Sequence, residues 1–360
     1  MSYNSNLVKN ARTFALWLSI PILAPAQFIA FQVPGAGRAI SPTAINDAGA
    51  IVGYYQVGAA QRYNGFLRAA DGTIATFAEP LSQPSGSTYP LAVNDKGAIA
   101  GFYTDTGNQE HGFLRHANGK FASFNGPGST QGTIASSINS AGAITGYYPG
   151  AFGVYHGFLR AASGAITKFD APGAGTANGQ GTYPSSINSA GAITGYYSDA
   201  NLTLHGFLRA ADGSFAQFDV RGAGVGAGLG TDPGAINTAG EIAGFYRDAN
   251  AVVHGFVRAV GGKIVSFDAP DAGTSSGQGT LPGSIDTRGE IAGEYVDAND
   301  LYHGFVRLGS GVFTSIDAPG AGTGAYQGTY SYSGCINREG DVTGFYVDAS
   351  GVYYGFLWTP

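Results

Sequence analysis

Short apolar runs alternate with turn-forming residues along almost the whole chain. In a representative segment, Gly, Asp and Asn separate runs that are rich in aromatic and β-branched residues. These turn residues suit hairpins because they tolerate positive φ angles. The pattern predicts four short antiparallel strands and then a longer loop, at residues 183–188, 192–197, 204–210, 214–219 and 220–230.

This unit recurs along the chain, as two sequence anchors show. The first is His-Gly-Phe-Leu-Arg or a close variant, and its glycines lie 45 to 51 residues apart, at Gly65, Gly112, Gly157, Gly206, Gly255, Gly304 and Gly355. The second is an aliphatic residue followed by Asn or Asp, at Ile45, Val93, Ile138, Ile187, Ile236, Ile285 and Ile336. Seven repeats of four strands predict a β-propeller and leave no room for a second domain.

The two ends of the repeat region complement each other. Residues 28–37 match the fourth run of other repeats, such as residues 169–175, whereas the chain ends after a third run at residues 352–358. We therefore predict an all-β, seven-bladed β-propeller with four-stranded blades over residues 27–360. Pairing of the N-terminal strand, residues 28–33, with the last blade would close the ring and remove two unpaired strand edges.

Composition and charge narrow the class of protein. The chain has 59 glycines among 360 residues, 12% charged residues and a formal net charge of −6. So much glycine excludes a mostly helical fold, and the lack of a basic surplus argues against nucleic acid as a partner. Cys335 is the single cysteine, which excludes an intrachain disulfide and a multi-cysteine metal site. We assign no metal site and expect no cofactor.

The N-terminal segment has the pattern of a secretory signal peptide. Lys9 and Arg12 precede an apolar run at residues 14–20, and Ala-Pro-Ala at residues 24–26 fits a cleavage site. The apolar run is too short to span a bilayer, although a short anchor that stays attached is the alternative. We expect residues 1–26 to be removed, leaving a secreted, periplasmic or cell-surface monomer without a membrane span.

The repeated elements resemble a known family. His-Gly-Phe-Leu-Arg and the pattern I-N-x-x-G-x-I-x-G-Y-Y, as at residues 187–197, are similar to HAF-type repeats, which are bacterial and extracellular. The resemblance covers all seven copies, over residues 28–358. It departs from that family in having Gly where Ala is frequent and Arg where Trp is frequent, except at Trp358. The resemblance implies export and a repeat fold, and it implies no established activity.

Polar residues that recur once in each blade are expected to hold the fold together rather than to form a site. The histidines should brace their own blades by hydrogen bonding, at His111, His156, His205, His254 and His303. The arginines of the same element are expected to pair with acids that end the fourth strands, namely Asp170, Asp219, Asp268 and Asp317. The tyrosines of the second strands are expected to pack between blades.

Candidate site residues are those that break the repeat. The residue four positions before the second anchor differs from blade to blade, as Ser41, Tyr89, Ile134, Tyr183, Asp232, Leu281 and Tyr332. The first strand of a propeller blade lines the central channel, so this position should lie at the channel mouth. We predict that Tyr89, Tyr183, Asp232 and Tyr332 bind a ligand by stacking and polar contacts; a variable, solvated rim is the alternative. Glu294 is also irregular, because other repeats have an aromatic residue there.

Three functions remain open from the sequence. The first is an exported, non-catalytic propeller that binds a glycan or protein ligand at its loop face and channel mouth. The second is a polysaccharide lyase with Tyr89, Tyr183 or Tyr332 as the base, although no cation is firmly placed to neutralise the substrate carboxylate. The third is a structural surface protein. The sequence has no nucleophile elbow and no catalytic carboxylate pair at a defined spacing, so we assign no catalytic residue.

Overall fold

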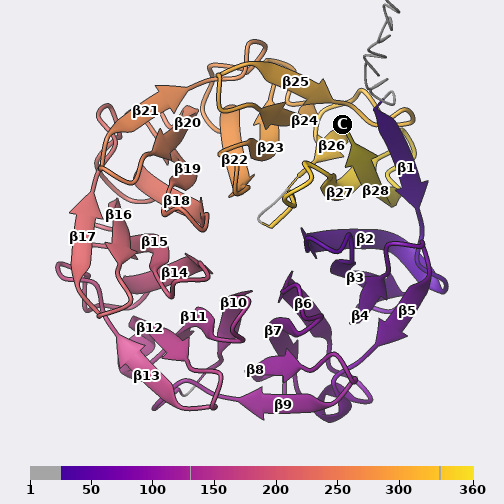
Figure 1. The fold of residues 1–360 in the computed structure, drawn as a ribbon, viewed down its shortest axis with the longest axis horizontal. Coiled ribbons are helices and arrows are strands. Elements are labelled where there is room, and N and C mark those ends of the chain that lie inside the picture. Colours follow the sequence, from indigo (N-terminus) through magenta and orange to yellow (C-terminus); the bar gives the residue numbers. More distant parts are fainter. Residues whose placement is uncertain (1–25, 130, 332–333) are drawn as a thin grey trace, which may run out of the picture.

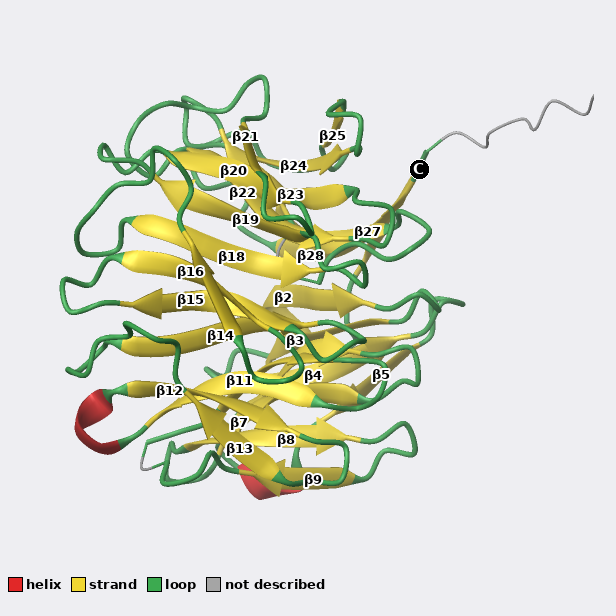
Figure 2. Cartoon of the chain, turned by 60° about the vertical axis from the view of Figure 1, so that its left-hand side comes forward, coloured by secondary structure: helices red, strands yellow, loops and turns green. Residues whose placement is uncertain are grey.

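The computed structural model describes residues 26–129, 131–331 and 334–360. Within these ranges the regular secondary structure is β-strand, apart from two short 3-10 helices at Pro80–Ser82 and Ala151–Gly153. Figure 1 shows the sheets arranged as a ring around a central opening, and Figure 2 shows the stacked strands from an oblique direction. The prediction of an all-β fold is confirmed. Nearly all of the predicted signal peptide, residues 1–25, lies outside the described residues.

The strands follow one another around the ring in chain order, and antiparallel pairing joins them in consecutive sheets. One sheet contains β2 (Ala36–Ile45), β3 (Ile51–Val57), β4 (Tyr63–Arg68) and β5 (Ile74–Phe77), and the next contains β6 (Thr88–Val93), β7 (Ile99–Thr104), β8 (Glu110–Arg115) and β9 (Phe121–Phe124). Then come β10 (Ile134–Ile138), β11 (Ile144–Pro149), β12 (Tyr155–Arg160) and β13 (Ile166–Phe169), followed by β14 (Gly181–Ile187), β15 (Ile193–Ser198), β16 (Leu204–Arg209) and β17 (Phe215–Phe218).

The remaining strands continue the same order. They are β18 (Gly230–Ile236), β19 (Ile242–Arg247), β20 (Val253–Arg258) and β21 (Ile264–Phe267), then β22 (Gly279–Ile285), β23 (Ile291–Val296), β24 (Tyr302–Arg307) and β25 (Phe313–Ile316). The last sheet contains β26 (Gly328–Tyr330), β27 (Val342–Val347), β28 (Tyr353–Thr359) and β1 (Gln27–Phe31).

The N-terminal strand β1 completes the sheet at the C-terminal end of the chain. It pairs antiparallel with β28 over five residues, with Phe28 opposite Trp358. The ring of Phe28 stacks on Phe356, with centroids 5.0 Å apart. In Figure 1 the indigo β1 accordingly lies beside the yellow β28. The first described residues therefore provide the outer strand that the last repeat lacks in the sequence.

Glycines of the repeated sequence patterns allow neighbouring strands to approach closely. A Cβ atom at Gly195 on β15 would come within 2.2 Å of the carbonyl oxygen of Tyr183 on β14. A Cβ atom at Gly206 on β16 would lie 2.7 Å from the ring of Phe218 on β17. Any larger residue would collide with backbone or a packed ring, so the repeated glycines are explained by strand packing.

The apolar core lies between neighbouring sheets. Ile193 and Phe207 are fully buried, and together with Tyr197 they pack against Phe169 and Ala171 at the end of the preceding sheet. Tyr197 thus confirms that a second-strand tyrosine packs between sheets. Because burying one such aromatic side chain contributes about 1.5–3 kcal/mol, these contacts stabilise each sheet against the one before it.

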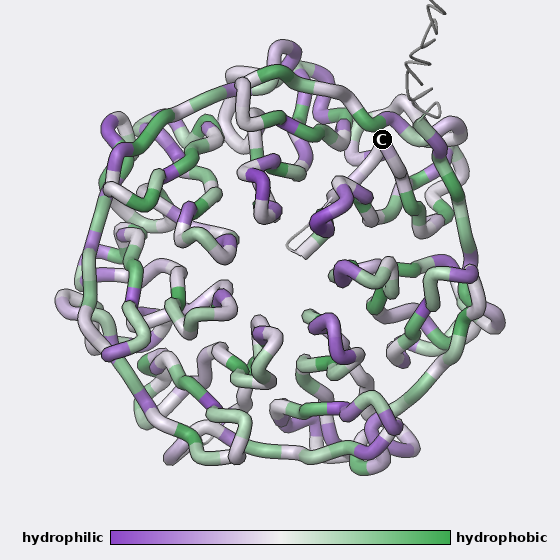
Figure 3. The backbone as a smooth tube through the Cα atoms, in the orientation of Figure 1, coloured by the Kyte–Doolittle hydropathy of each residue, from purple (hydrophilic) through white to green (hydrophobic). Residues whose placement is uncertain are grey.

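The Asn of the second anchor links one sheet to the next. Asn188 Nδ2 donates to the carbonyl oxygen of Asn237 at 3.0 Å, and the Ala192 N–H donates to Asn188 Oδ1 within the same turn. Equivalent inter-sheet bonds run from Asn46 to Asn94, Asn94 to Asn139, Asn139 to Asn188, Asn237 to Asp286 and Asn337 to Asn46. Figure 3 shows hydrophilic residues at the inner ends of several sheets, around the central opening. The second anchor therefore serves the architecture.

The repeated histidines confirm the expected bracing role. His205 Nδ1 lies 3.0 Å from Asp219, the residue after β17, and the imidazole stacks on Tyr197 with centroids 5.0 Å apart. The other copies make the same type of contact, His156 with Asp170, His254 with Asp268 and His303 with Asp317, while His111 contacts Asn125. Each of these histidines therefore connects the third strand to the end of the fourth strand.

The predicted pairing of the repeated arginines with these same aspartates is wrong. The guanidinium of Arg209 lies over the ring of Phe169 in the preceding sheet, 4.9 Å from its centroid. The strand register explains the difference, because Arg209 on β16 lies opposite Phe215, whereas Gly206 lies opposite Phe218. Asp219 therefore lies beside the histidine that precedes Gly206. The arginines contribute cation–π contacts between sheets instead.

Candidate ligand-binding site at the channel mouth

The loops between sheets and the loops between second and third strands lie on one face of the ring. Gln180 Nε2 donates to the Ala200 carbonyl at 3.0 Å, and the Gly175 N–H donates to the Ser198 carbonyl at 2.8 Å. Strand β14 starts at this face, directly after Gln180. Small side chains of the first strands line an axial cavity of about 180 Å³, among them Ala44, Ala92, Ser137, Ser186, Ala235 and Ser284. The start of each first strand thus lies near the channel mouth.

Tyr183 belongs to a cluster of tyrosines at this mouth. It lies opposite Tyr196 on β15, and the two rings stack with centroids 4.8 Å apart and planes 15° from parallel. Tyr155 and Tyr147 complete the cluster, with their ring centroids 4.8 and 5.3 Å from that of Tyr183. The Tyr183 hydroxyl donates to the Gly179 carbonyl at 2.8 Å. Stacking and this hydrogen bond hold the ring in one orientation.

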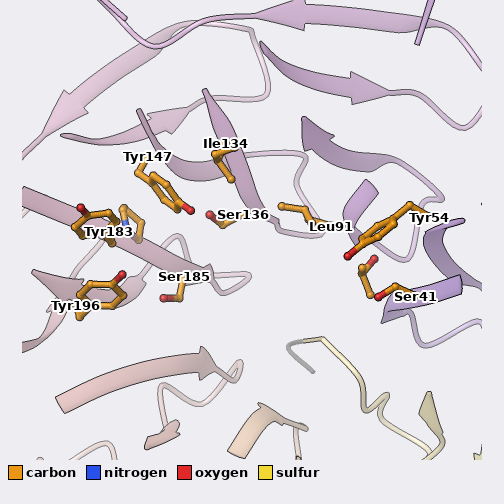
Figure 4. Close-up of a pocket in the computed structure, with 11 residues that line it drawn as sticks. Ser41, Tyr54, Leu91, Ile134, Ser136, Tyr147, Tyr183, Ser185 and Tyr196 are labelled. Carbon is orange, nitrogen blue, oxygen red and sulfur yellow. The ribbon is translucent and has the colours of Figure 1, made fainter. Parts of the chain in front are cut away.

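The tyrosine cluster forms one wall of a cavity of about 450 Å³. Figure 4 shows Tyr147, Tyr183 and Tyr196 on one side and Tyr54 on the other, with Ser136, Ser185 and Leu91 between them. Ser41 adds a further hydroxyl group beside Tyr54, and Ile134 adds apolar surface. The cavity therefore combines aromatic walls with a few hydroxyl groups, which is typical of a site for a small polar ligand.

Tyr89 lies in a second aromatic cluster, next to this cavity. Its ring stacks on Phe102 with centroids 4.7 Å apart, and it contacts the rings of Tyr54 and Tyr63 at 5.1 and 5.7 Å. Tyr54 forms part of the cavity wall. Tyr89 therefore packs against Tyr54, which belongs to the cavity wall.

Tyr332 lies outside the described residues, so its predicted role stays a prediction. In the last sheet, Tyr330 on β26 occupies the position that Tyr183 has on β14. Tyr330 lies opposite Phe345, and its hydroxyl donates to the Tyr326 carbonyl at 2.8 Å, which is the same four-residue spacing as in Tyr183. Tyr330 also lines a neighbouring cavity of about 310 Å³, together with Tyr54.

The sequence contains a signal that identifies Tyr330. The dipeptide Gly-Thr precedes both Tyr183 and Tyr330, whereas the second anchor follows Tyr330 two residues later than it follows Tyr183. Counting backward from Ile336 therefore selects Tyr332, and counting forward from Gly-Thr selects Tyr330. A two-residue insertion in the last first-strand segment accounts for the difference.

Asp232 and Glu294 contribute to a third cavity at the same mouth. This cavity of about 260 Å³ is lined by Ser185, Asp232, Phe245, Leu281, Glu294 and Ser331, together with Gly234, Pro282 and Gly283. Asp232 on β18 lies opposite Phe245 of β19, and Glu294 on β23 lies opposite Leu281 of β22. Ser185 also lines the tyrosine-walled cavity, so the two cavities are adjacent.

Burial strongly perturbs both carboxyl groups. Glu294 is 4% exposed, and burial raises its pKa to about 8, although the Ser331 N–H donates to its Oε2 at 3.0 Å. Burial raises the pKa of Asp232 to about 7, against the opposing effect of the Arg247 guanidinium. In each case desolvation is the largest cause of the raised pKa, and it acts in this direction because it penalises the charged form of the carboxyl group. At neutral pH, Glu294 is therefore mostly protonated. The sequence identified both residues as irregular and could not show that they share a cavity.

Among the residues that the structure describes, there is no group of three or more His, Cys, Asp or Glu side chains able to hold a metal ion. Cys335 is buried, and burial raises the pKa of its thiol. Within the described ranges, no helix has the length and apolar character needed to cross a membrane.

Comparison with known proteins identifies the fold. No family model and no curated protein matches the chain. Among solved structures, a streptogramin B lyase is similar, with 15% identity and a TM-score of 0.58, covering 92% of this chain and 97% of that one. The BP39L lectin from Burkholderia pseudomallei is also similar, with 10% identity and a TM-score of 0.55, covering 91% and 98%. At these identities the likeness concerns the fold alone.

Together with the ring of antiparallel sheets, these matches place the chain among the β-propellers. This class is compatible with ligand binding and with catalysis, so the function has to be argued from the cavities at the channel mouth.

Proposed function

We propose that the chain is a seven-bladed β-propeller with four strands in each blade, and that β1 closes the ring by pairing with β28. The seven copies of both sequence anchors support this count. The hydrogen bond from Asn337 to the Asn46 carbonyl, which joins residues 291 positions apart, supports closure. We also propose that residues 27–360 form this single domain, and that residues 1–26 direct export to the periplasm, cell surface or medium. N-terminal sequencing of the mature chain from a bacterial host tests the export, and a chain that starts at Met1 would contradict it.

We propose that the channel mouth binds a glycan without transforming it. The observation that carries this proposal is the cavity of about 450 Å³ with Tyr54, Tyr147, Tyr183 and Tyr196 in its walls and serine hydroxyls between them. The apolar faces of sugar rings stack on aromatic side chains, and sugar hydroxyl groups bond to polar groups such as serine. One of the similar structures is a lectin, which agrees with this use of the fold.

A glycan fits this site better than a protein ligand does. The four tyrosines line a concave cavity of the size of a small ligand, whereas protein interfaces are extended surfaces of about 800 Å² for each partner. The tyrosine rings are also held in place, because stacking fixes Tyr183 on Tyr196. Pre-organised rings reduce the entropy lost on binding.

A lyase function has less support. Burial raises the pKa of the Tyr183 and Tyr89 hydroxyl groups above the ordinary value, and a base with a raised pKa is mostly protonated at neutral pH. A lyase would also need a cation for the uronate carboxylate. The neighbouring cavity contains the carboxyl groups of Asp232 and Glu294, and the guanidinium of Arg247 already acts on Asp232.

Binding to a glycan array tests the proposed function. We expect at least one glycan to bind, and we expect Tyr183→Ala to weaken binding by about tenfold or more, which corresponds to about 1.4 kcal/mol. His205→Ala is the matched control, because it removes a ring that belongs to the repeated bracing contacts. Equal loss in both variants would show that the tyrosine acts through the fold, and an array without any binding would refute the proposal. Unsaturated-sugar absorbance on uronate polysaccharides would indicate the lyase instead.

A further inference from the structure

The two acidic breaks in the repeat meet at one cavity. Asp232 replaces the Tyr or aliphatic residue found at this first-strand position in most other repeats, and Glu294 replaces an aromatic residue on a second strand. The two residues belong to neighbouring sheets, on β18 and β23, yet both line the cavity of about 260 Å³. This cavity adjoins the tyrosine-walled cavity through Ser185.

One buried hydroxyl group at this cavity lacks a hydrogen-bond partner among the described residues. Ser331 is 1% exposed, and its hydroxyl has no hydrogen-bond partner among the described residues. Asp232 is half-buried in the wall of the same cavity. Glu294 accepts one hydrogen bond, from the Ser331 N–H. Buried polar groups without partners are costly, so a ligand that supplies donors would gain from filling this cavity.

The charged groups around the two carboxyls do not balance the negative charge of two carboxylates. Asp232 interacts with Arg247 on β19 and with Tyr196 on β15. Glu294 interacts with Tyr302 on β24, Tyr330 on β26 and Cys335. Among these described neighbours Arg247 is the single cation, and the phenols and the thiol are neutral. Two ionised carboxylates would therefore have one positive charge between them.

We infer that this acidic cavity, with Asp232, Glu294 and Ser331 in its wall, binds a protonated primary amine, so that the ligand of the channel mouth is a glycan containing unacetylated amino sugars. The inference rests on the proposed glycan-binding function and specifies its substrate class. The ammonium group supplies three donors for two carboxylates and one hydroxyl, while the sugar ring and its neighbours reach the tyrosines across Ser185. An N-acetylated sugar cannot supply the charge, and its single amide N–H replaces the three donors of the ammonium group.

Binding of oligomers of glucosamine and of N-acetylglucosamine, of equal length, tests the inference by calorimetry. We expect the wild-type chain to prefer the glucosamine oligomer by about tenfold or more. Glu294→Gln should remove most of this preference, and Asp232→Asn should reduce it. Glu110→Gln is the matched control, because it removes a carboxyl from the start of β8, outside the acidic cavity, and it should keep the preference.

The pH dependence of this preference provides a second readout. It would be absent if Asp232 and Glu294 only supported the fold. Ammonium binding needs ionised carboxylates, and the carboxyl groups in the cavity hold protons at low pH. The preference for the glucosamine oligomer should therefore fall from about pH 7.5 to about pH 5.5, and its binding should release protons within this range. Binding of the N-acetylated oligomer should lack this dependence.

The outcomes separate the inference from the function on which it rests. If the chain binds the N-acetylated oligomer as well as or better than the glucosamine oligomer, the amine site is refuted while glycan binding stands. A preference that survives Glu294→Gln and Asp232→Asn, or that disappears in Glu110→Gln, would also refute the site. If neither these oligomers nor any glycan of the array binds, the proposed function itself fails.

Discussion

The buried carboxyl of Glu294 predicts an unusual dependence of stability on pH. The folded chain holds this proton up to a pKa of about 8, whereas the ordinary value is 4.5. Between these two pH values the unfolded chain releases the proton and the folded chain retains it. The folded state then binds more protons, so the free energy of unfolding falls as the pH rises through this range. The sign is opposite to that of a salt-bridged carboxylate.

Glu294→Gln isolates this effect, because the amide has almost the same shape and does not titrate. Each pKa unit corresponds to about 1.4 kcal/mol, so the free energy of unfolding of the wild type should fall relative to the variant by about 3 kcal/mol between about pH 5 and about pH 8. Any constant cost of the substitution cancels in this comparison. Contributions from other groups, including Asp232, cancel to the extent that they are independent of Glu294.

Denaturant unfolding of both chains at several pH values measures this difference. Glu339→Gln is the matched control, since the side chain of Glu339 is 64% exposed, and its curve should run parallel to that of the wild type. Parallel curves for the wild type and Glu294→Gln would refute the reasoning, because they would mean that Glu294 titrates alike in the folded and unfolded chains.

Three further predictions concern the ring itself. Asn188→Ala leaves the buried Asn237 carbonyl without its inter-sheet donor, so the free energy of unfolding should fall by about 1–3 kcal/mol in a denaturant titration; an unchanged value would contradict the role of the second anchor. Phe207→Ala should cost about 3–5 kcal/mol in the same assay because the ring is fully buried, whereas Phe152→Ala, at a side chain that is 91% exposed, should stay within about 0.5 kcal/mol. A chain without residues 1–32 exposes the edge of β28, so its Tm should fall and light scattering should detect self-association; an equally stable monomer would contradict closure by β1.

Much of the local structure could be predicted from the sequence because the repeat supplies the same information several times. The predicted runs at residues 183–188 and 192–197 differ from β14 and β15 by at most two residues at each end. Each run lies between turn residues, and each has a counterpart in the other repeats. Tyr197 and His205 could also be assigned to packing and bracing, because residues that recur in most of the repeats serve the structure that the repeats share.

The errors arose where a prediction depended on relative position in space. Aspartates after the fourth strands were expected to meet arginines, and only the antiparallel register of β16 and β17 shows that Asp219 lies beside His205. Because of the two-residue insertion before Ile336, counting from the two sequence landmarks gives Tyr330 or Tyr332, and the prediction for Tyr332 stays a prediction. The meeting of Asp232 and Glu294 could not be predicted either, because one lies on a first strand and the other on the second strand of the next sheet.

The distribution of these irregular residues makes the channel mouth asymmetric around its axis. A ring of identical blades would present the same group at each position around its axis, and it could not orient an asymmetric ligand. Here the tyrosine wall comes from β11, β14 and β15, and the acidic wall comes from β18 and β23 further along the chain, with Ser185 lining both cavities. A ligand that fills both cavities must therefore place an apolar ring face toward the tyrosines and its donors toward the carboxyl groups. An amino sugar within a glycan carries both groups at a fixed separation, so a single orientation satisfies both walls.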